Sequence, residues 1–143
     1  YGATNNNTKQ LETLKSLFSK NQSIETEIYL LHKLAELGDI EFVQERSTYW
    51  FQEKPHYLNF ELQKYIGDIL SDHLEAPDFI EYCKLIFERE RFVGLLYSMV
   101  RVYEEMRESD LAIVIIKEWL ELDPTNDDLI QLYDYMIQMN SFQ

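Results

Sequence analysis

Apolar residues recur every three to four positions along most of the chain, which is the spacing of one face of an α-helix. Tight turns of the Asn-Gly type, which join strands into hairpins, do not occur in the sequence. The pattern therefore predicts an all-α chain without strands. The expected helices cover about residues 8–19, 24–37, 40–51, 56–70, 78–87, 91–106, 111–120 and 127–139.

Residues typical of helix ends stand between these segments. Ser23, Asp39 and Asp110 are suited to cap the start of a helix, because a short polar side chain can accept a hydrogen bond from the first turn. Gly38 tolerates the left-handed conformation that often ends a helix. Pro124 stops the seventh segment, and the polar residues at 125–126 cap the eighth. Helices joined by loops this short are expected to be antiparallel neighbours.

The composition agrees with a single helical domain. The chain has 143 residues, 45% of them hydrophobic, with only four Gly and three Pro. That length suits one domain with a sizeable core. Residues 1–7 are small and polar and are expected to be disordered, which leaves one domain over residues 8–143.

A period of about 34 residues runs through the apolar positions. Three columns of four positions can be followed at this spacing, and all twelve members are apolar or aromatic. The columns are Ile28, Leu62, Leu96 and Ile130; Leu31, Tyr65, Met99 and Tyr133; and Ala35, Ile69, Tyr103 and Ile137. Such agreement indicates repeated helical hairpins, each of which needs its neighbours to bury its apolar face.

Residues 93–126 carry the most specific form of the repeat, and here the chain resembles the tetratricopeptide repeat family. Tyr103, Ala112 and Pro124 match the Tyr, Ala and Pro of that family's 34-residue pattern. Leu96, Met99, Val100 and Ile116 fill the places of its Trp, Leu, Gly and Phe. Residues 25–58 keep "AELGD" and Pro55, and residues 59–92 match least.

Two residues depart from the family pattern. Val100 carries a side chain where the family keeps Gly, and is expected to push neighbouring helices slightly apart. Trp119 is bulky where a small residue is usual, which implies altered packing. Related helical-hairpin arrays would give the same weak period.

The resemblance implies a right-handed superhelical array of antiparallel helix pairs, an α-solenoid of about eight helices. The run "LAIVII" at 111–116 is apolar on nearly every side, so we expect both a partner helix and a following repeat to cover it. The last helix alternates polar residues such as Asp127 and Asp134 with its apolar ones, and this outer face suits a terminal cap. The first helix falls outside the repeats, as a cap or as half of a missing repeat.

In tetratricopeptide domains the first helix of each pair lines a concave binding groove. Carried over by position, the groove columns hold Tyr29, Lys33, Gln63, Gly67, Tyr97, Arg101, Gln131 and Tyr135. Tyr and Arg are frequent anchors of bound peptides. The alternative for each tyrosine is a helix-packing role with a hydrated hydroxyl. Members of the family that capture a peptide's terminal carboxylate use a Lys and Asn cluster, which these columns lack.

The net charge of −13 limits the class of partner. From Ser71 onward there are 16 acidic and 6 basic residues, hence −10, against −3 before it. An acidic domain repels phosphate backbones, which argues against nucleic acid. A basic protein or peptide partner agrees with this charge, although the charge also serves solubility. Self-association stays open.

No catalytic motif stands out in the sequence. The three histidines form no metalloprotease spacing, and "SDHLE" at 71–75 is interpreted as a solvated turn rather than a metal site. Cys83 is the only cysteine and is expected to be a small core residue in a reducing, cytoplasmic setting. The longest aliphatic run is far too short to cross a membrane. We expect no enzyme activity, no metal and no cofactor.

The sequence therefore favours a non-enzymatic scaffold that binds a partner protein or peptide in the concave face of a helical repeat array. The alternative is a regulatory or sensor module of a larger protein that binds a peptide signal. A helical enzyme that uses His73 or Cys83 is the third hypothesis.

Overall fold

The computed structural model describes residues 2–18 and 23–140, with side chains from Thr8 onward, and contains helices but no strand in that part of the chain. The all-α prediction is confirmed. The α-helices are α1 (Gly2–Leu17), α2 (Ile24–Glu36), α3 (Ile40–Glu53), α4 (Phe60–His73), α5 (Ala76–Phe87), α6 (Val93–Glu105), α7 (Ser109–Leu122) and α8 (Asp127–Asn140), with a 3-10 turn, η1 (Pro55–Tyr57), before α4.

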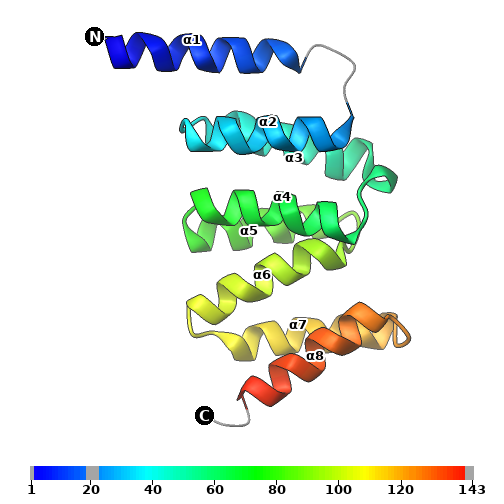
Figure 1. Cartoon of the computed structure of the whole chain (residues 1–143). Helices are drawn as coiled ribbons and strands as arrows, with labels where there is room; N and C mark the ends of the chain where they lie inside the picture. The colour runs from blue at the N-terminus through cyan, green and yellow to red at the C-terminus, as the bar shows by residue number, and fades with distance from the viewer. Residues whose placement is uncertain (1, 19–22, 141–143) are drawn as a thin grey trace.

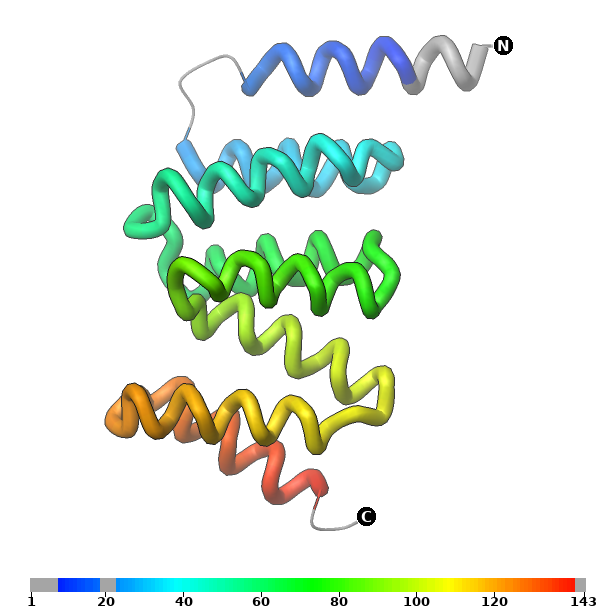
Figure 2. The backbone as a smooth tube through the Cα atoms, turned by 180° about the vertical axis from the view of Figure 1, so that it is seen from behind, coloured from blue at the N-terminus to red at the C-terminus, as the bar shows by residue number. Residues whose placement is uncertain are grey.

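The helices follow one another down the molecule, with α1 at one end and α8 at the other (Figure 1). In this view α2, α4, α6 and α8 lie in front of α3, α5 and α7, and the opposite view reverses the two layers (Figure 2). Helices of the front layer contact each other in turn, α2 with α4, α4 with α6 and α6 with α8. One continuous core of buried apolar side chains runs through these contacts.

Several predicted helix ends are confirmed. The Ser23 hydroxyl accepts a hydrogen bond from the Thr26 amide, and the Asp39 carboxylate accepts one from Phe42 at 3.4 Å. Gly38 has a φ of 95°, the left-handed conformation that its position requires. The side chain of Asn126 accepts from the Leu129 amide at 3.1 Å and so caps α8.

Other boundaries differ from the prediction. The fourth helix begins at Phe60 rather than near 56, because the Pro55–Tyr57 turn precedes it and the Asn59 side chain caps it at the Leu62 amide. Asp110 is not a cap, since the chain reverses at Arg107, whose φ is 60°, and α7 begins at Ser109.

The first helix begins at Gly2, so residues 2–7, expected to be disordered, belong to α1. Asn and Thr are only moderately poor helix formers and can extend a helix that is stabilised further along. The expected end of this helix at Ser19 lies outside the described residues.

The contact between α4 and α6 is the most extensive between any two helices in the described chain. Gly94 lies so near α4 that a Cβ there would come within 2.2 Å of the Phe60 carbonyl oxygen. Gly67 faces α6, where a Cβ would come within 2.5 Å of the Ser98 hydroxyl. The absence of a side chain at these two positions allows the helices to meet.

At the amino-terminal end, a buried carboxylate joins the helices. Glu27 on α2 accepts a hydrogen bond from the Trp50 indole and one of 2.7 Å from the Arg46 guanidinium, both on α3. The Arg46 guanidinium also lies 5.6 Å from the centre of the Phe18 ring, which follows α1. These hydrogen bonds join α2 to α3, and Arg46 also brings α3 beside the end of α1.

The columns of the 34-residue period are mostly buried, with exceptions at defined places. Tyr65 on α4 and both Ile130 and Ile137 on α8 are exposed. The exposed surface of α8 carries Ile130 and Ile137 as well as the exposed Asp127 and Asp134, so the predicted polar terminal cap is confirmed only in part. Leu111 and Val114 of the "LAIVII" run are also exposed, because within the described residues no helix lies beyond α7 and α8.

The two departures from the repeat pattern are both buried. Trp119 packs edge-on against Phe87 of α5, with ring centres 4.8 Å apart. Val100 lies beside Leu132 and Tyr135 of α8 in the wall of a surface depression. Cys83 is fully buried, as predicted.

We predict that Gly94→Ala lowers the free energy of unfolding by about 2–3 kcal/mol, the upper range for forced overpacking, because the added methyl meets backbone that cannot rotate away. Gly67→Ala should cost less, since the Ser98 side chain can turn and alanine favours the helix. Urea denaturation of both variants would measure the difference. An unchanged midpoint for Gly94→Ala would contradict the close α4–α6 contact.

Candidate interaction site

Four of the residues predicted to line a groove lie around one surface depression. Tyr97 and Arg101 come from α6, and Gln131 and Tyr135 come from α8. The depression has a volume of about 390 Å³. The remaining lining is supplied by α4, α6 and α8, through Lys64, Asp68, Val100, Glu104 and Leu132.

The other predicted residues lie apart from this depression. Tyr29 and Lys33 on α2 border a separate groove of about 570 Å³ between α1 and α2, where the Lys33 ammonium lies 5.6 Å from the centre of the Tyr29 ring. Gln63 borders neither opening. The structure thus places six of the predicted residues around two separate openings and leaves Gln63 and Gly67 outside both.

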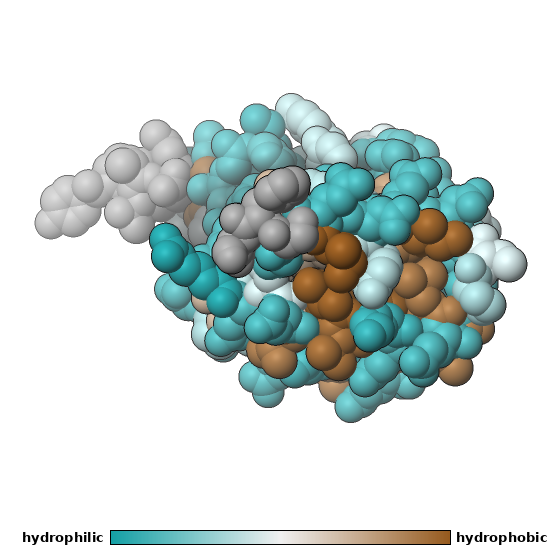
Figure 3. All heavy atoms as spheres, turned by 90° about the horizontal axis from the view of Figure 1, so that it is seen from below, coloured by the Kyte–Doolittle hydropathy of each residue, from teal (hydrophilic) through white to brown (hydrophobic). Residues whose placement is uncertain are grey.

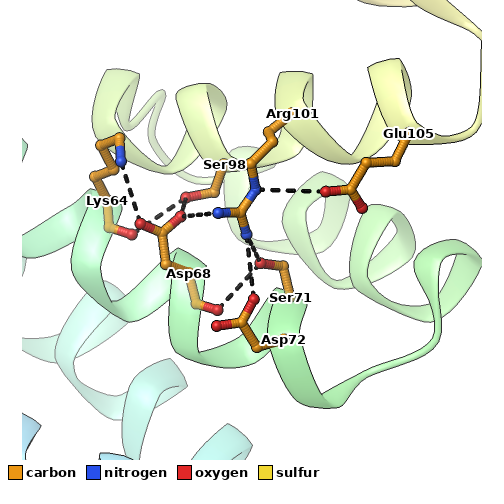
Figure 4. A network of polar contacts seen from close by, with 7 residues as sticks. All are labelled: Lys64, Asp68, Ser71, Asp72, Ser98, Arg101 and Glu105. Carbon is orange, nitrogen blue, oxygen red and sulfur yellow. Dashed lines mark hydrogen bonds and ion pairs between the residues drawn. The ribbon is translucent and has the colours of Figure 1, made fainter.

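Arg101 is surrounded by acidic groups, as Figure 4 shows. Its guanidinium nitrogens lie 3.5 Å from carboxylate oxygens of Asp68 and of Asp72 on α4, and its Nε lies 3.9 Å from Glu105. The same side chain donates a hydrogen bond to the Ser71 hydroxyl. Arg101 therefore connects α6 to α4, and carboxylates of the same chain balance its positive charge.

Asp68 is the centre of this network. It accepts a hydrogen bond of 2.9 Å from the Ser98 hydroxyl and lies 3.2 Å from the Lys64 ammonium (Figure 4). Ser98 also contacts the Lys64 carbonyl oxygen at 3.2 Å, a bond that spans 34 residues. Two basic side chains, Lys64 and Arg101, face three carboxylates. These carboxylates belong to Asp68, Asp72 and Glu105, so the network is acidic overall.

This network was not predicted from the sequence, which favours a solvated turn at residues 71–75. Ser71 and Asp72 instead lie in the last turn of α4. A signal for the network was present, because Asp68 and Arg101 are separated by nearly one full repeat. Residues at that spacing lie on adjacent front helices, where these two side chains form an ion pair.

Tyr97 and Gln63 share one position of the 34-residue period, and each side chain forms a hydrogen bond with the main chain of the residue 31 positions later, in opposite directions. The Tyr97 hydroxyl donates a hydrogen bond of 2.6 Å to the Asp128 carbonyl oxygen, 31 residues later. Gln63 accepts one of 2.9 Å from the Gly94 amide, also 31 residues later. Each side chain thus reaches the first turn of the next front helix.

The environment of Tyr97 explains its chemistry. Its ring lies edge-on to Phe60, with ring centres 4.9 Å apart. Burial, together with the charge of Asp128, raises the pKa of Tyr97. Its hydroxyl therefore stays protonated as a structural donor, while the residue also lines the depression. Tyr135 is exposed and has no such contact among the described hydrogen bonds.

Acidic groups dominate the electrostatics around the depression. Glu104 lies in its wall, and partial burial, with the neighbouring Glu105 charge, raises the pKa of Glu104. Asp72 and Glu105 are mostly exposed on the same side of α4 and α6. A cation placed here would relieve the repulsion among these carboxylates.

Outside the depression, the Cys83 thiol is buried and the potential metal ligands of the described residues are dispersed. No group of three or more His, Cys, Asp and Glu side chains is arranged to hold a metal ion within residues 8–18 and 23–140. Burial raises the pKa of the Cys83 thiol well above its ordinary value, the opposite of what a nucleophilic thiolate requires. None of the described helices has the length and apolar character needed to cross a membrane.

Comparisons of the chain with models of protein families, with curated proteins and with solved structures found no match.

We predict that Tyr97→Phe lowers the free energy of unfolding by about 1 kcal/mol, the net value of one hydrogen bond, and speeds hydrogen exchange in the first turns of α8. Tyr29→Phe is the matched control, because the Tyr29 side chain is 61% exposed. Equal effects of the two substitutions in exchange mass spectrometry and denaturation would exclude a specific Tyr97–Asp128 bond.

Proposed function

We propose that this chain is a non-enzymatic interaction domain that binds a segment of a partner protein along the face formed by α4, α6 and α8. The observation that carries the proposal is the shared depression. Tyr97, Arg101, Gln131 and Tyr135 were selected by sequence position alone, and all four line it.

The fold that we propose for this function is a right-handed array of antiparallel helix pairs of the tetratricopeptide type. Contacts that recur at the repeat spacing support it. Thr48 and Tyr82 share a hydrogen bond across 34 residues, as do Ser98 and Lys64. The succession of contacts among α2, α4, α6 and α8 is what stacked pairs would produce.

The chemistry of the depression favours a basic segment. Its lining is more apolar than polar: the exposed Tyr135 ring and the buried side chains of Val100 and Leu132 border it beside Glu104. A lysine or arginine can lay its aliphatic stem on such a surface while its charged end meets carboxylates. Arg101 is already balanced by Asp68 and Asp72, so it does not favour an acidic ligand.

Selection from a library of displayed random peptides on the immobilised chain would test this proposal. We expect enrichment of peptides with Lys or Arg next to an aliphatic or aromatic residue. The variant Asp72→Asn/Glu104→Gln keeps the side-chain shapes and removes two charges. It should weaken binding of a selected peptide by about fivefold or more, corresponding to about 1 kcal/mol for partly exposed charges. Fluorescence anisotropy would give the affinities.

The matched control is Glu118→Gln/Glu121→Gln, which removes two exposed charges from α7. This control should bind the peptide as the parent chain does. An equal loss in both variants would mean that only the overall charge matters. Enrichment of acidic peptides, or of none, would contradict the proposed site.

The raised pKa of Glu104 predicts a pH dependence of this binding. A basic ligand needs the ionised carboxylate, and that form is lost as the pH falls through the raised pKa. Affinity should therefore begin to decline at a higher pH than an ordinary glutamate, with a pKa of about 4.3, would cause. Titrations between about pH 7 and 4 would measure it. Glu104→Gln should flatten the early part of the decline; an affinity that rises on acidification would contradict the prediction.

A further inference from the structure

The outward face of α8 carries apolar side chains at positions that are buried elsewhere in the period. Ile130 and Ile137 are 37% and 40% exposed, whereas Leu96 and Tyr103, one period before them, are 0% and 3% exposed. In α6 these positions are covered by neighbouring helices. The outward face of α8 is therefore built like an interior helix face that lacks its cover.

The adjoining helix shows the same difference. Val114 on α7 is 53% exposed, whereas Ile80, one period earlier on α5, is 7% exposed. Figure 3 views the molecule from the α8 end and shows apolar side chains gathered among polar ones. The apolar side chains at this end of the described chain include Leu111, Val114, Ile130, Tyr133 and Ile137. A partly apolar face of this kind is typical of an interaction surface.

The opposite end of the molecule has a complementary gap. Shifted by one period, α3 (40–53) corresponds to residues 6–19, so α1 occupies the place of a back-layer helix. In the interior, α2 packs against both α3 and α4. The described chain has no helix that packs in the same way against α1 and α2.

A groove lies at that place, between α1 and α2. It has a volume of about 570 Å³, and its exposed lining is more apolar than polar. The lining residues are Lys9, Gln10, Thr13, Leu14, Tyr29, Lys33, Glu36 and Leu37. A helix placed in this groove would precede α2 in the series α2, α4, α6 and α8. By the repeat spacing, it would hold the position of a front-layer helix such as α8.

The charges of the two ends are complementary. The α8 helix contains Asp127, Asp128 and Asp134 and no lysine or arginine. The groove between α1 and α2 presents two basic side chains, Lys9 and Lys33, and one acidic side chain, Glu36, which lies 3.9 Å from the Lys33 ammonium. A second copy of the chain would therefore bring an acidic helix with an apolar stripe to a groove with basic residues on an apolar floor.

We propose that copies of this chain associate head to tail, with α8 of one copy seated in the groove between α1 and α2 of the next. The contact completes one helix pair from two chains. It covers Ile130 and Ile137 and brings Asp127 and Asp134 to the lysines of the groove. Such a contact joins two different surfaces, so it continues into a ring or an open filament rather than ending at a dimer.

This association is distinct from partner binding. At 100° per residue, Ile130, Tyr133 and Ile137 lie on one side of α8, and Gln131 and Tyr135 lie on another. The depression between α6 and α8 therefore stays open when the outward face is covered.

Sedimentation velocity of the 143-residue chain, over about a hundredfold range of concentration at low salt, would test the proposal. We expect the mean mass to rise beyond that of a dimer with concentration. Ile137→Lys should abolish the rise while the far-ultraviolet circular dichroism stays that of the parent. A chain that is monomeric throughout, or that stops at a dimer, would overturn the proposal.

A charge exchange makes the test specific to the two surfaces. Lys9→Glu/Lys33→Glu reverses the groove, and Asp127→Lys/Asp134→Lys reverses α8. Each variant alone should stay monomeric, and an equimolar mixture should associate, because each then offers the other complementary ends. Lys84→Glu/Lys117→Glu, which changes exposed residues of α5 and α7, is the control and should associate as the parent does. Failure of the mixture to associate would reject this pair of surfaces.

Discussion

The close contact of α4 and α6 is the constraint on which the rest of the structure depends. Gly94 and Gly67 allow two helix backbones to approach where any side chain would separate them. This approach brings Ser98 within reach of Lys64 and Asp68, and Arg101 within reach of Asp72. A wider spacing would leave these groups to water and would move the α6 wall of the depression away from α4.

The polar network on this contact has two consequences. Arg101 is held by carboxylates of its own chain, so it supplies shape and connection rather than unbalanced positive charge. The excess of carboxylates around it leaves the surface acidic. An arginine by itself suggests a site for acidic ligands, but Arg101 is part of a surface that suits basic ligands.

Helix positions could be predicted because their signals are local. Ser23, Asp39 and Asn126 cap helices through their own neighbours, and Gly38 adopts the conformation that its position demands. Asp110 failed as a predicted cap because the reversal at Arg107, with its positive φ, starts the helix earlier. Boundaries thus depend on backbone geometry that residue type alone does not determine.

The candidate site could be predicted only in part. The period placed Tyr97, Arg101, Gln131 and Tyr135 on one surface, because equivalent positions face the same way. It did not separate Tyr29 and Lys33 from them, because the period does not tell how far α2 lies from α6 and α8. The balance of charge around Arg101 depends on contacts between helices, which no single helical stripe contains.

The hydrogen bonds of Gln63 and Tyr97 end on main-chain atoms of Gly94 and Asp128. Every residue offers a backbone carbonyl, so the bond that Tyr97 donates does not depend on the side chain of residue 128. The bond that Gln63 accepts does depend on glycine at position 94, because a Cβ there would come within 2.7 Å of the Gln63 Cβ. The Asp128 side chain, by contrast, can be exchanged while α8 keeps this tether to α6. Mutational drift, or deliberate redesign, can change the side chain at position 128 without loss of the hydrogen bond that joins the two helices.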